Sequence, residues 1–197
     1  DRVELVGYVL LTDDLVDTPG YSGETMNTLV GMDADGAITG VKIVRHSEPI
    51  VLIGLPEATI HEFTNQYPGK QITDRILISR EPTPDYVTVD GISGATVTAV
   101  AENATILEAS RLVGRAEGIV SAAQESSVAC LPDNVGLLQG PRHHHEGQHG
   151  FFGRLQASDV GPQIGEVLGR WGIQLSRGAD LVGGIAREHL VVSRRVV

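Results

Sequence analysis

A short stretch of small residues joins an expected strand to the longest expected helix, and this junction constrains the fold most strongly. Residues 86–89 are β-branched and aromatic, which predicts a strand. Residues 90–96 follow directly, read DGISGAT and have the form D-x-x-S-G-A-T. Residues 99–115 carry a roughly helical apolar stripe with Glu102 in the first turn, which predicts a helix. The fold must therefore place a strand and a helix on either side of one tight turn.

The remaining pattern predicts an α+β domain, in which packed helices accompany an antiparallel sheet meander. Further strands are expected at residues 3–12, 26–32, 37–45 and 76–79, and a short helix at residues 56–67. An Asp-Gly turn at residues 33–36 predicts a hairpin. These elements make up a domain at residues 1–118. Residues 119–197 are expected to be a C-terminal extension of unknown or irregular structure, in which residues 164–171 are compatible with a helix.

Charge and cysteine content exclude several classes of protein. The formal charge is −10, and residues 1–120 alone hold 18 acidic and 8 basic side chains. An acidic domain argues against nucleic acid and anionic membranes as partners, because these bind through lysine and arginine. Cys130 is the single cysteine, so the chain forms no internal disulfide and ligates no iron–sulfur cluster by itself. No apolar run approaches the roughly 20 residues that span a bilayer.

The junction offers what a phosphoester anchor requires. Thr96 and Thr98 each supply a hydroxyl, while Ser93, Gly94 and Ala95 leave space for a phosphate near the backbone. Backbone N–H groups and the dipole at the start of a helix attract an anion. Asp90 is placed to orient the hydroxyl or to help bind a metal during transfer. The alternative is a plain turn in which Thr96 or Thr98 caps the helix.

The same residues carry a resemblance to a known family. D-x-x-S-G-A-T at residues 90–96 resembles the site at which bacterial FMN-binding domains receive a flavin covalently. Residues 20–23 (GYSG), 29–33 (LVGMD) and 36–41 (GAITGV) look like the core meander of these domains. Flavin subunits of Rnf and Nqr complexes usually carry E-T-P-G-L-G after the meander, whereas residues 46–57 here read HSEPIVLIGLPE. This segment is similar to the NosR/NirI type, and the resemblance covers about residues 1–118.

The resemblance implies a covalent cofactor and a location. FMN would be attached to Thr96 through a phosphoester by a separate flavin transferase. The domain would lie at the periplasmic face of the bacterial inner membrane, as part of a longer protein with membrane and iron–sulfur parts. It would support the activity or maturation of nitrous oxide reductase, through that enzyme or its assembly factors.

A flavin ring also needs an apolar slot with polar contacts at its edge. Residues 48–54 offer both, and Tyr21 and Ser22 are weaker candidates. The predicted contacts in the segment are Glu48, Pro49, Ile50, Leu52 and Gly54, with Val51 and Ile53 adding to the ring faces. The alternative for residues 50–53 is an ordinary buried strand.

Other functions remain open at this stage. A flavin-based redox-sensing or regulatory domain, an electron-carrying subunit of an Rnf- or Nqr-like complex, and a structural interaction domain fit the same fold. A histidine cluster at residues 143–149 is compatible with a metal site, but its surrounding glycines favour a plain loop, and no metal is predicted. The chain is expected to transfer electrons rather than to turn over a substrate, and no catalytic residue is predicted.

Overall fold

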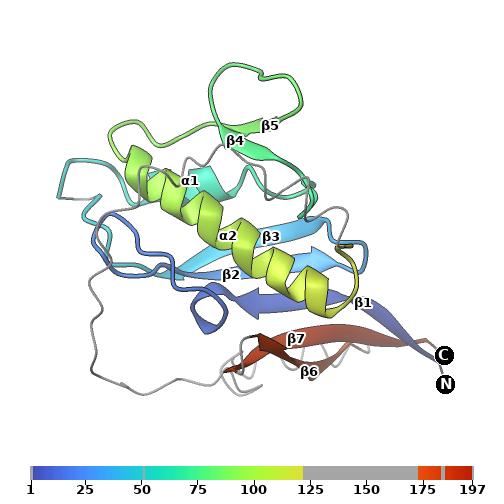
Figure 1. The fold of residues 1–197 in the computed structure, drawn as a ribbon. Helices are drawn as coiled ribbons and strands as arrows, with labels where there is room; N and C mark the ends of the chain where they lie inside the picture. The colour runs from blue at the N-terminus through green and yellow to red at the C-terminus, as the bar shows by residue number, and fades with distance from the viewer. Residues whose placement is uncertain (1, 51, 122–172, 183–184, 197) are drawn as a thin grey trace.

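An antiparallel five-stranded sheet is the centre of the protein (Figure 1). The computed structural model describes residues 2–50, 52–121, 173–182 and 185–196. The strands follow the order β3-β2-β1-β7-β6 across the sheet. Their bounds are Arg2–Leu11 (β1), Asn27–Asp33 (β2), Ile38–Arg45 (β3), Ile173–Val182 (β6) and Ile185–Val196 (β7). The expected α+β fold with an antiparallel meander is confirmed.

The β2–β3 hairpin forms where the Asp-Gly turn predicts it. The carboxylate of Asp33 accepts hydrogen bonds from the N–H groups of Asp35 (3.0 Å) and Ala37 (2.8 Å). Gly36 adopts a φ of +85°, a conformation that a residue with a Cβ rarely takes. Turn chemistry local to four residues therefore fixes the pairing of β2 with β3.

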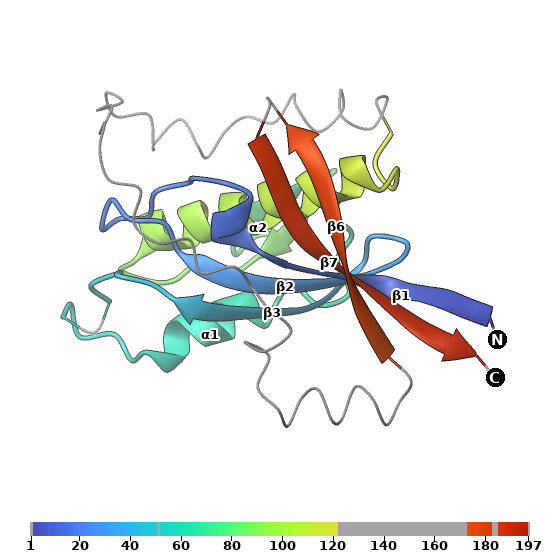
Figure 2. The same ribbon diagram turned by 90° about the horizontal axis from the view of Figure 1, so that it is seen from below.

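One long helix crosses the sheet, as the two views in Figures 1 and 2 show. Helix α2 spans Thr96–Ala116 and contacts β1 and β2. A short helix α1 (Ala58–Thr64) contacts β3, and a 3-10 turn η1 (Thr12–Asp14) follows β1. Strands β4 (Ile76–Ile78) and β5 (Val87–Val89) form a separate parallel pair. No helix in these described parts is both long and apolar enough to cross a membrane.

The core lies between α2 and the sheet and is mostly aliphatic. Val30 and Ile38 on the strands and Ile106 and Val113 on α2 are at most 1% exposed. Tyr67, just beyond α1, is fully buried and packs edge-on against Phe63. Small residues on the inner face of α2 bring the helix close to the sheet, at Ala99, Ala101 and Ala109.

Strands β6 and β7 were not predicted from the sequence. The backbone of β7 pairs with β1 from Arg2↔Val196 to Val9↔Leu190, and β6 pairs with β7. Residues at the end of the chain thus extend the sheet beyond β1, as Figure 2 shows. The domain boundary at residue 118 stays a prediction. Cys130, the histidine cluster at 143–149 and the compatible helix at 164–171 lie outside the described residues.

Both helices differ from the expected bounds. Helix α1 is shorter than residues 56–67, because the chain turns after Thr64 and directs Tyr67 into the core. Helix α2 begins at Thr96, three residues before the expected start. Ala95 is its N-cap residue and makes no side-chain cap, so the alternative in which a threonine hydroxyl caps this helix is wrong. The backbone turn before the helix, and not a side-chain cap, sets where α2 begins.

Candidate functional site

A pocket of about 350 Å³ opens at the N-terminus of α2. Three segments far apart in sequence form its walls: the loop at Tyr21, the loop after β3, and the turn that leads into the first turn of the helix. The lining residues are Tyr21, Pro49, Ile50, Ile53, Gly94, Ala95, Thr96, Val97 and Thr98. The volume lies within the range of small-molecule and cofactor sites, and the lining is mainly apolar.

The turn at residues 90–95 places the helix start at this pocket. The N–H of Ala95 donates to the carbonyl of Ile92 (3.0 Å), and Gly94 adopts a φ of +85°. The side-chain amide of Gln66 pairs with both backbone groups of Asp90, at 2.8 and 3.0 Å. The backbone path therefore favours glycine at position 94, in addition to the space that this residue leaves at the pocket.

The two candidate hydroxyls have different environments. Thr96 is exposed and lies on the pocket wall. Thr98 is 2% exposed, and its hydroxyl donates to a carboxylate oxygen of Glu48. Only the Thr96 hydroxyl of this pair is open to a modifying group.

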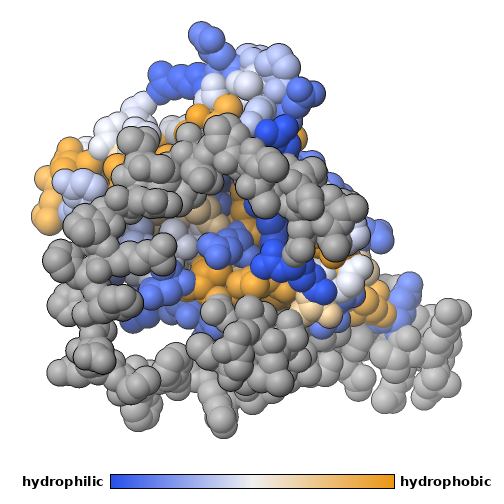
Figure 3. Space-filling model, in the orientation of Figure 1, coloured by the Kyte–Doolittle hydropathy of each residue, from blue (hydrophilic) through white to orange (hydrophobic). Residues whose placement is uncertain are grey.

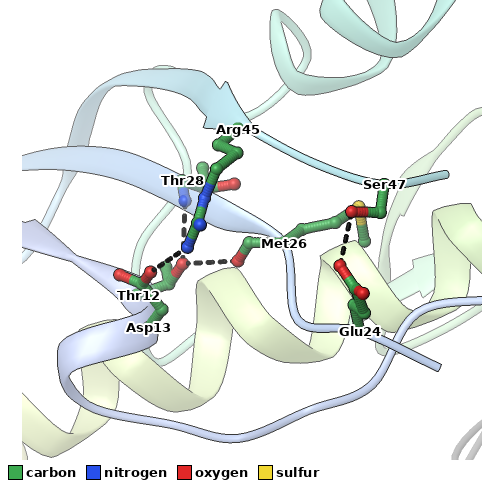
Figure 4. Close-up of polar contacts among 7 residues, drawn as sticks. All are labelled: Thr12, Asp13, Glu24, Met26, Thr28, Arg45 and Ser47. Atoms are coloured by element: carbon green, nitrogen blue, oxygen red, sulfur yellow. Dashed lines mark hydrogen bonds and ion pairs between the residues drawn. The ribbon is translucent and has the colours of Figure 1, made fainter. Parts of the chain in front are cut away.

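Glu48 joins three segments beneath the pocket. Besides Thr98, the backbone N–H groups of Tyr21 (3.1 Å) and Ser22 (2.9 Å) donate to its carboxylate, and the residue is 6% exposed. Gly20 permits this approach, because a Cβ there would lie 2.9 Å from the Glu48 carboxyl carbon. Beside this contact, the hydroxyl of Ser47 donates to Glu24 (Figure 4). The loop at residues 20–24 is thereby fixed to the start of α2.

The loop after β3 supplies the apolar wall and is not a strand. Ile53 N–H donates to the Pro49 carbonyl (3.2 Å) and Leu55 N–H to the Ile50 carbonyl (3.0 Å), so residues 49–55 fold back on themselves. The alternative of a buried strand at residues 50–53 is wrong for this reason. Ile50 is 1% exposed, whereas Leu52 is 88% and Ile53 55% exposed. This loop lies at the left edge of Figure 1, where Figure 3 shows a hydrophobic patch.

The structure brings about half of the predicted contact residues onto the pocket wall. Those that line it are Tyr21, Pro49, Ile50, Gly94, Ala95, Thr96 and Thr98. Glu48 and Ser22 lie behind the wall in the contact just described. Leu52 projects into solvent, Gly54 forms the loop turn with a φ of +84°, and Asp90 and Ser93 are exposed beside the pocket.

Two residues near the site were not among the predicted contacts. Val97 lines the pocket beside Thr96. Ile53, which was expected at the ring faces, also lines the pocket, and Val51 lies outside the described residues. Arg80 donates a hydrogen bond to the Ser93 hydroxyl (2.6 Å) from the loop between β4 and β5. No motif signals Val97 or Arg80; their positions follow from the helix register and from the β4–β5 crossover.

A second acid, Glu102, lies one helical turn beyond Thr98 and is fully buried. Burial is the main cause that raises its pKa to about 7. A hydrogen bond from the Thr28 hydroxyl (2.7 Å) lowers the pKa, and the charge of Glu48 raises it. The sequence predicted Glu102 in the first turn of a helix; in the structure α2 begins earlier, and Glu102 lies in its second turn, on a buried face.

Comparison with known proteins identifies the family of the region that contains this pocket. Residues 20–110 match the family described as FMN-binding domain. Regulatory protein NosR of Pseudomonas aeruginosa is 38% identical over 117 residues, which is 59% of this chain and 16% of the relative. NosR of Stutzerimonas stutzeri is 36% identical over 119 residues, which is 60% of this chain and 16% of the relative. The chain thus spans about a sixth of the length of these relatives.

A relative of another kind matches the same region. One subunit of the Na(+)-translocating ferredoxin:NAD(+) oxidoreductase complex of Acetobacterium woodii is 31% identical over 99 residues, which is 50% of this chain and 44% of that relative. The matched family segment contains the loop at 20–24, the pocket wall at 49–55 and the motif at 90–96. The NosR proteins are relatives of this chain. Residues 20–110 of the chain therefore belong to the FMN-binding domain family.

Proposed function

We propose that this chain carries FMN covalently, through a phosphoester to Thr96, and transfers electrons by means of it. The observation that carries the proposal is the contrast between the two hydroxyls at the helix start. Thr96 is exposed on the pocket wall, whereas Thr98 is buried and bonded to Glu48.

The residues present fit this cofactor. Pro49, Ile50 and Ile53 supply apolar lining, and Gly94 and Ala95 supply small residues to the same pocket. The first turn of α2 presents backbone N–H groups and the positive end of the helix dipole, which favour a phosphate. When bound, the flavin supplies one- or two-electron transfer, which no side chain in the pocket provides.

The protein's own part is positioning. Glu48 accepts hydrogen bonds both from the loop that carries Tyr21 and from the helix that carries Thr96. These bonds hold the loop and the helix at a fixed separation. Tyr21 is 66% exposed and lines the pocket with Ile53, so both side chains are free to pack against a bound ring.

We propose that the domain is part of a longer protein and lies at the periplasmic face of a bacterial membrane. The match to a small fraction of the NosR relatives supports the longer protein, because most of their length is left for other parts. The periplasmic face is what the resemblance to the NosR/NirI type implies. A flavin transferase would load it, and membrane and iron–sulfur parts of the same protein would exchange electrons with it. The process served would be the activity or assembly of nitrous oxide reductase.

Two other functions have specific support. The word regulatory in the name of both NosR relatives favours a redox-sensing domain. The match to part of a sodium-translocating oxidoreductase complex favours an electron-carrying subunit. Electron exchange with a reduced donor separates carrier from sensor, because a flavin-loaded domain that does not exchange electrons rapidly would contradict the carrier function.

Intact-mass measurement tests the attachment. Protein produced together with a flavin transferase in an exporting host should gain the mass of FMN minus one water. Thr96→Ala should lose this gain, whereas Thr96→Ser should keep part of it because the hydroxyl remains. Thr98→Ser is the matched control, since it retains both the hydroxyl and the bond to Glu48. An unmodified wild type, or a fully modified Thr96→Ala, would refute the proposal.

A further inference from the structure

Two buried acidic residues lie beneath the pocket, and the proposed function uses only one of them, Glu48. Thr98 lines the pocket and donates to Glu48, and Glu102 follows Thr98 by one turn of α2. Both acidic residues are buried, at 6% and 0% exposed. Two acids at this depth repel each other, because little solvent separates their charges.

The two acids differ in how their oxygens are bonded. Both oxygens of Glu48 accept hydrogen bonds, from two backbone N–H groups and from the Thr98 hydroxyl. Only Oε1 of Glu102 is bonded, to Thr28, and Oε2 is a buried oxygen with no hydrogen-bond partner. A proton on Glu48 would displace a donor, whereas a proton on Oε2 of Glu102 displaces none. Glu102 is therefore the acid of the pair that can be protonated without loss of a hydrogen bond.

The donor to Glu102 is itself fixed in place. The Thr28 N–H donates to Thr12 Oγ1 (2.9 Å), and the Thr12 hydroxyl donates to the Met26 carbonyl (3.1 Å), as Figure 4 shows. These two bonds hold the backbone of Thr28, whose hydroxyl donates to Glu102.

One further titratable group faces Glu102. Besides Glu48, the phenol of Tyr67 interacts with Glu102, and burial and that carboxylate both raise the pKa of the phenol. Tyr67 donates to Asn103 (2.8 Å) and stays neutral. The proton that is exchanged near neutrality therefore belongs to Glu102 and not to the phenol.

We propose that Glu102 takes up a proton from solvent when a flavin in the pocket is reduced, and so couples the protonation of the core to the redox state of the cofactor. This inference rests on the proposed function. Reduction by two electrons and one proton would leave a negative charge on the ring, next to the pocket wall at Thr98, whose hydroxyl donates to Glu48 behind it. One further proton from solvent converts the Glu102 carboxylate to the acid and compensates that charge. Because Glu102 titrates at about pH 7, both of its states are accessible near neutrality.

The test is the pH dependence of the flavin midpoint potential, measured on flavin-loaded protein in a spectroelectrochemical cell. The electrode supplies the electrons and the solvent supplies the protons. Around pH 7 the midpoint potential of the wild type should fall more steeply with pH than that of Glu102→Gln. The difference between the two slopes should approach the slope expected for one additional proton taken up per flavin. Glu108→Gln is the matched control, because Glu108 lies on the same helix and is exposed. Equal slopes in all three proteins would overturn the inference.

Two further measurements keep the test decisive. A reduced-minus-oxidised infrared spectrum should show a protonated carboxyl band that Glu102→Gln lacks; a spectrum without that difference would contradict the proposal.

Thr28→Val removes the bond that lowers the pKa of Glu102, so the pH range in which the midpoint potential falls most steeply should move to higher pH. An unmoved region would overturn the inference even if Glu102→Gln failed to fold. Intact mass confirms flavin in each sample, so failed loading counts against the proposed function and not against this one.

Discussion

At the scale of single residues, two buried acids decide the character of the site. Glu48 is surrounded by three donors and acts as a structural junction. Glu102 has one donor and one unpartnered oxygen. Buried polar groups are normally fully hydrogen-bonded, so an orphaned carboxylate oxygen in a core marks either strain or a proton.

A substitution at Gly20 tests the contacts that Glu48 makes with the loop at residues 20–24. A Cβ at Gly20 would collide with the carboxyl group of Glu48, so Gly20→Ala should displace that group from Tyr21 and Ser22. We expect a loss of about 1–3 kcal/mol in the free energy of unfolding, measured by urea denaturation. We also expect a smaller fraction of the protein to carry flavin, measured by intact mass.

Gly40→Ala is the control for this change. Nothing lies within 4 Å of a Cβ at Gly40, so the variant should unfold within about 0.5 kcal/mol of wild type. Equal stability of the two variants would show that Glu48 does not need the space at Gly20.

Glu102 should make the flavin-free domain less stable as the pH rises. Its folded-state pKa of about 7 lies above the ordinary glutamate value of 4.5, so the folded protein holds the proton longer than the unfolded chain. Stability is then lost as pH rises from 4.5 to 7, by up to about 3 kcal/mol at ~1.4 kcal/mol per pH unit.

The measurement compares unfolding free energies of wild type and Glu102→Gln across that window. The glutamine variant should gain relative to wild type with rising pH, whereas Glu108→Gln should follow wild type throughout. A constant difference between Glu102→Gln and wild type would mean that Glu102 does not titrate between these values.

At the scale of elements, the first turn of α2 lines the pocket, and a side chain near the C-terminal end of the helix bonds to the rest of the domain. The start depends on a turn with a glycine at positive φ, which the motif at residues 90–96 encodes locally. The later tie is tertiary: the Arg111 side chain donates to the carbonyls of Ile72 (2.7 Å) and Asp74 (2.8 Å). Burial lowers the pKa of Arg111 to about 10, so the group stays charged at neutral pH.

Arg111→Met should therefore destabilise the domain. The substitution leaves two backbone carbonyls without their donors, at an expected cost of about 1–3 kcal/mol in the free energy of unfolding. Arg45→Met is the matched control, because the Arg45 side chain is 74% exposed and pairs with Asp13 at 3.3 Å (Figure 4), a surface contact of about 1 kcal/mol or less. Urea denaturation that ranks Arg45→Met as the more damaging change would contradict this account.

At the scale of the whole molecule, the sheet is assembled from both ends of the described chain. Strand β1 lies between β2 and β7, whereas β3 is an outer strand. Pairing β1 on both sides satisfies its backbone groups and removes an exposed edge, which is a common site of association.

Hydrogen exchange on the intact protein tests this arrangement residue by residue. Amide protons along β1 should exchange slowly at Tyr8 and Val9 alike, because neighbours on both sides accept them. Along β3, alternate amides that face away from β2 should exchange faster. Strand β2, paired on both sides within the meander, is the internal standard for slow exchange. Fast exchange at alternate β1 amides would show that β7 does not pair there in solution.

The sequence by itself determined the local chemistry of this protein. Alternation, turn residues and a helical stripe predicted the β2–β3 hairpin, the strands β4 and β5, and α2, because these features depend on neighbours within a few residues. The motif at residues 90–96 and the meander residues predicted the FMN-binding family, which comparison confirms.

Only the tertiary structure decided which of these residues meet and which are buried. Leu52 and Ile50 are two apolar residues of one loop, yet one is 88% and the other 1% exposed, because the loop folds back on itself. The sequence did not predict Glu48 beneath Thr98, fifty residues away, nor the burial of Glu102, nor the pairing of β7 with β1. These depend on contacts between distant segments, and side-chain periodicity carries no information about the partner of a face or of a strand edge.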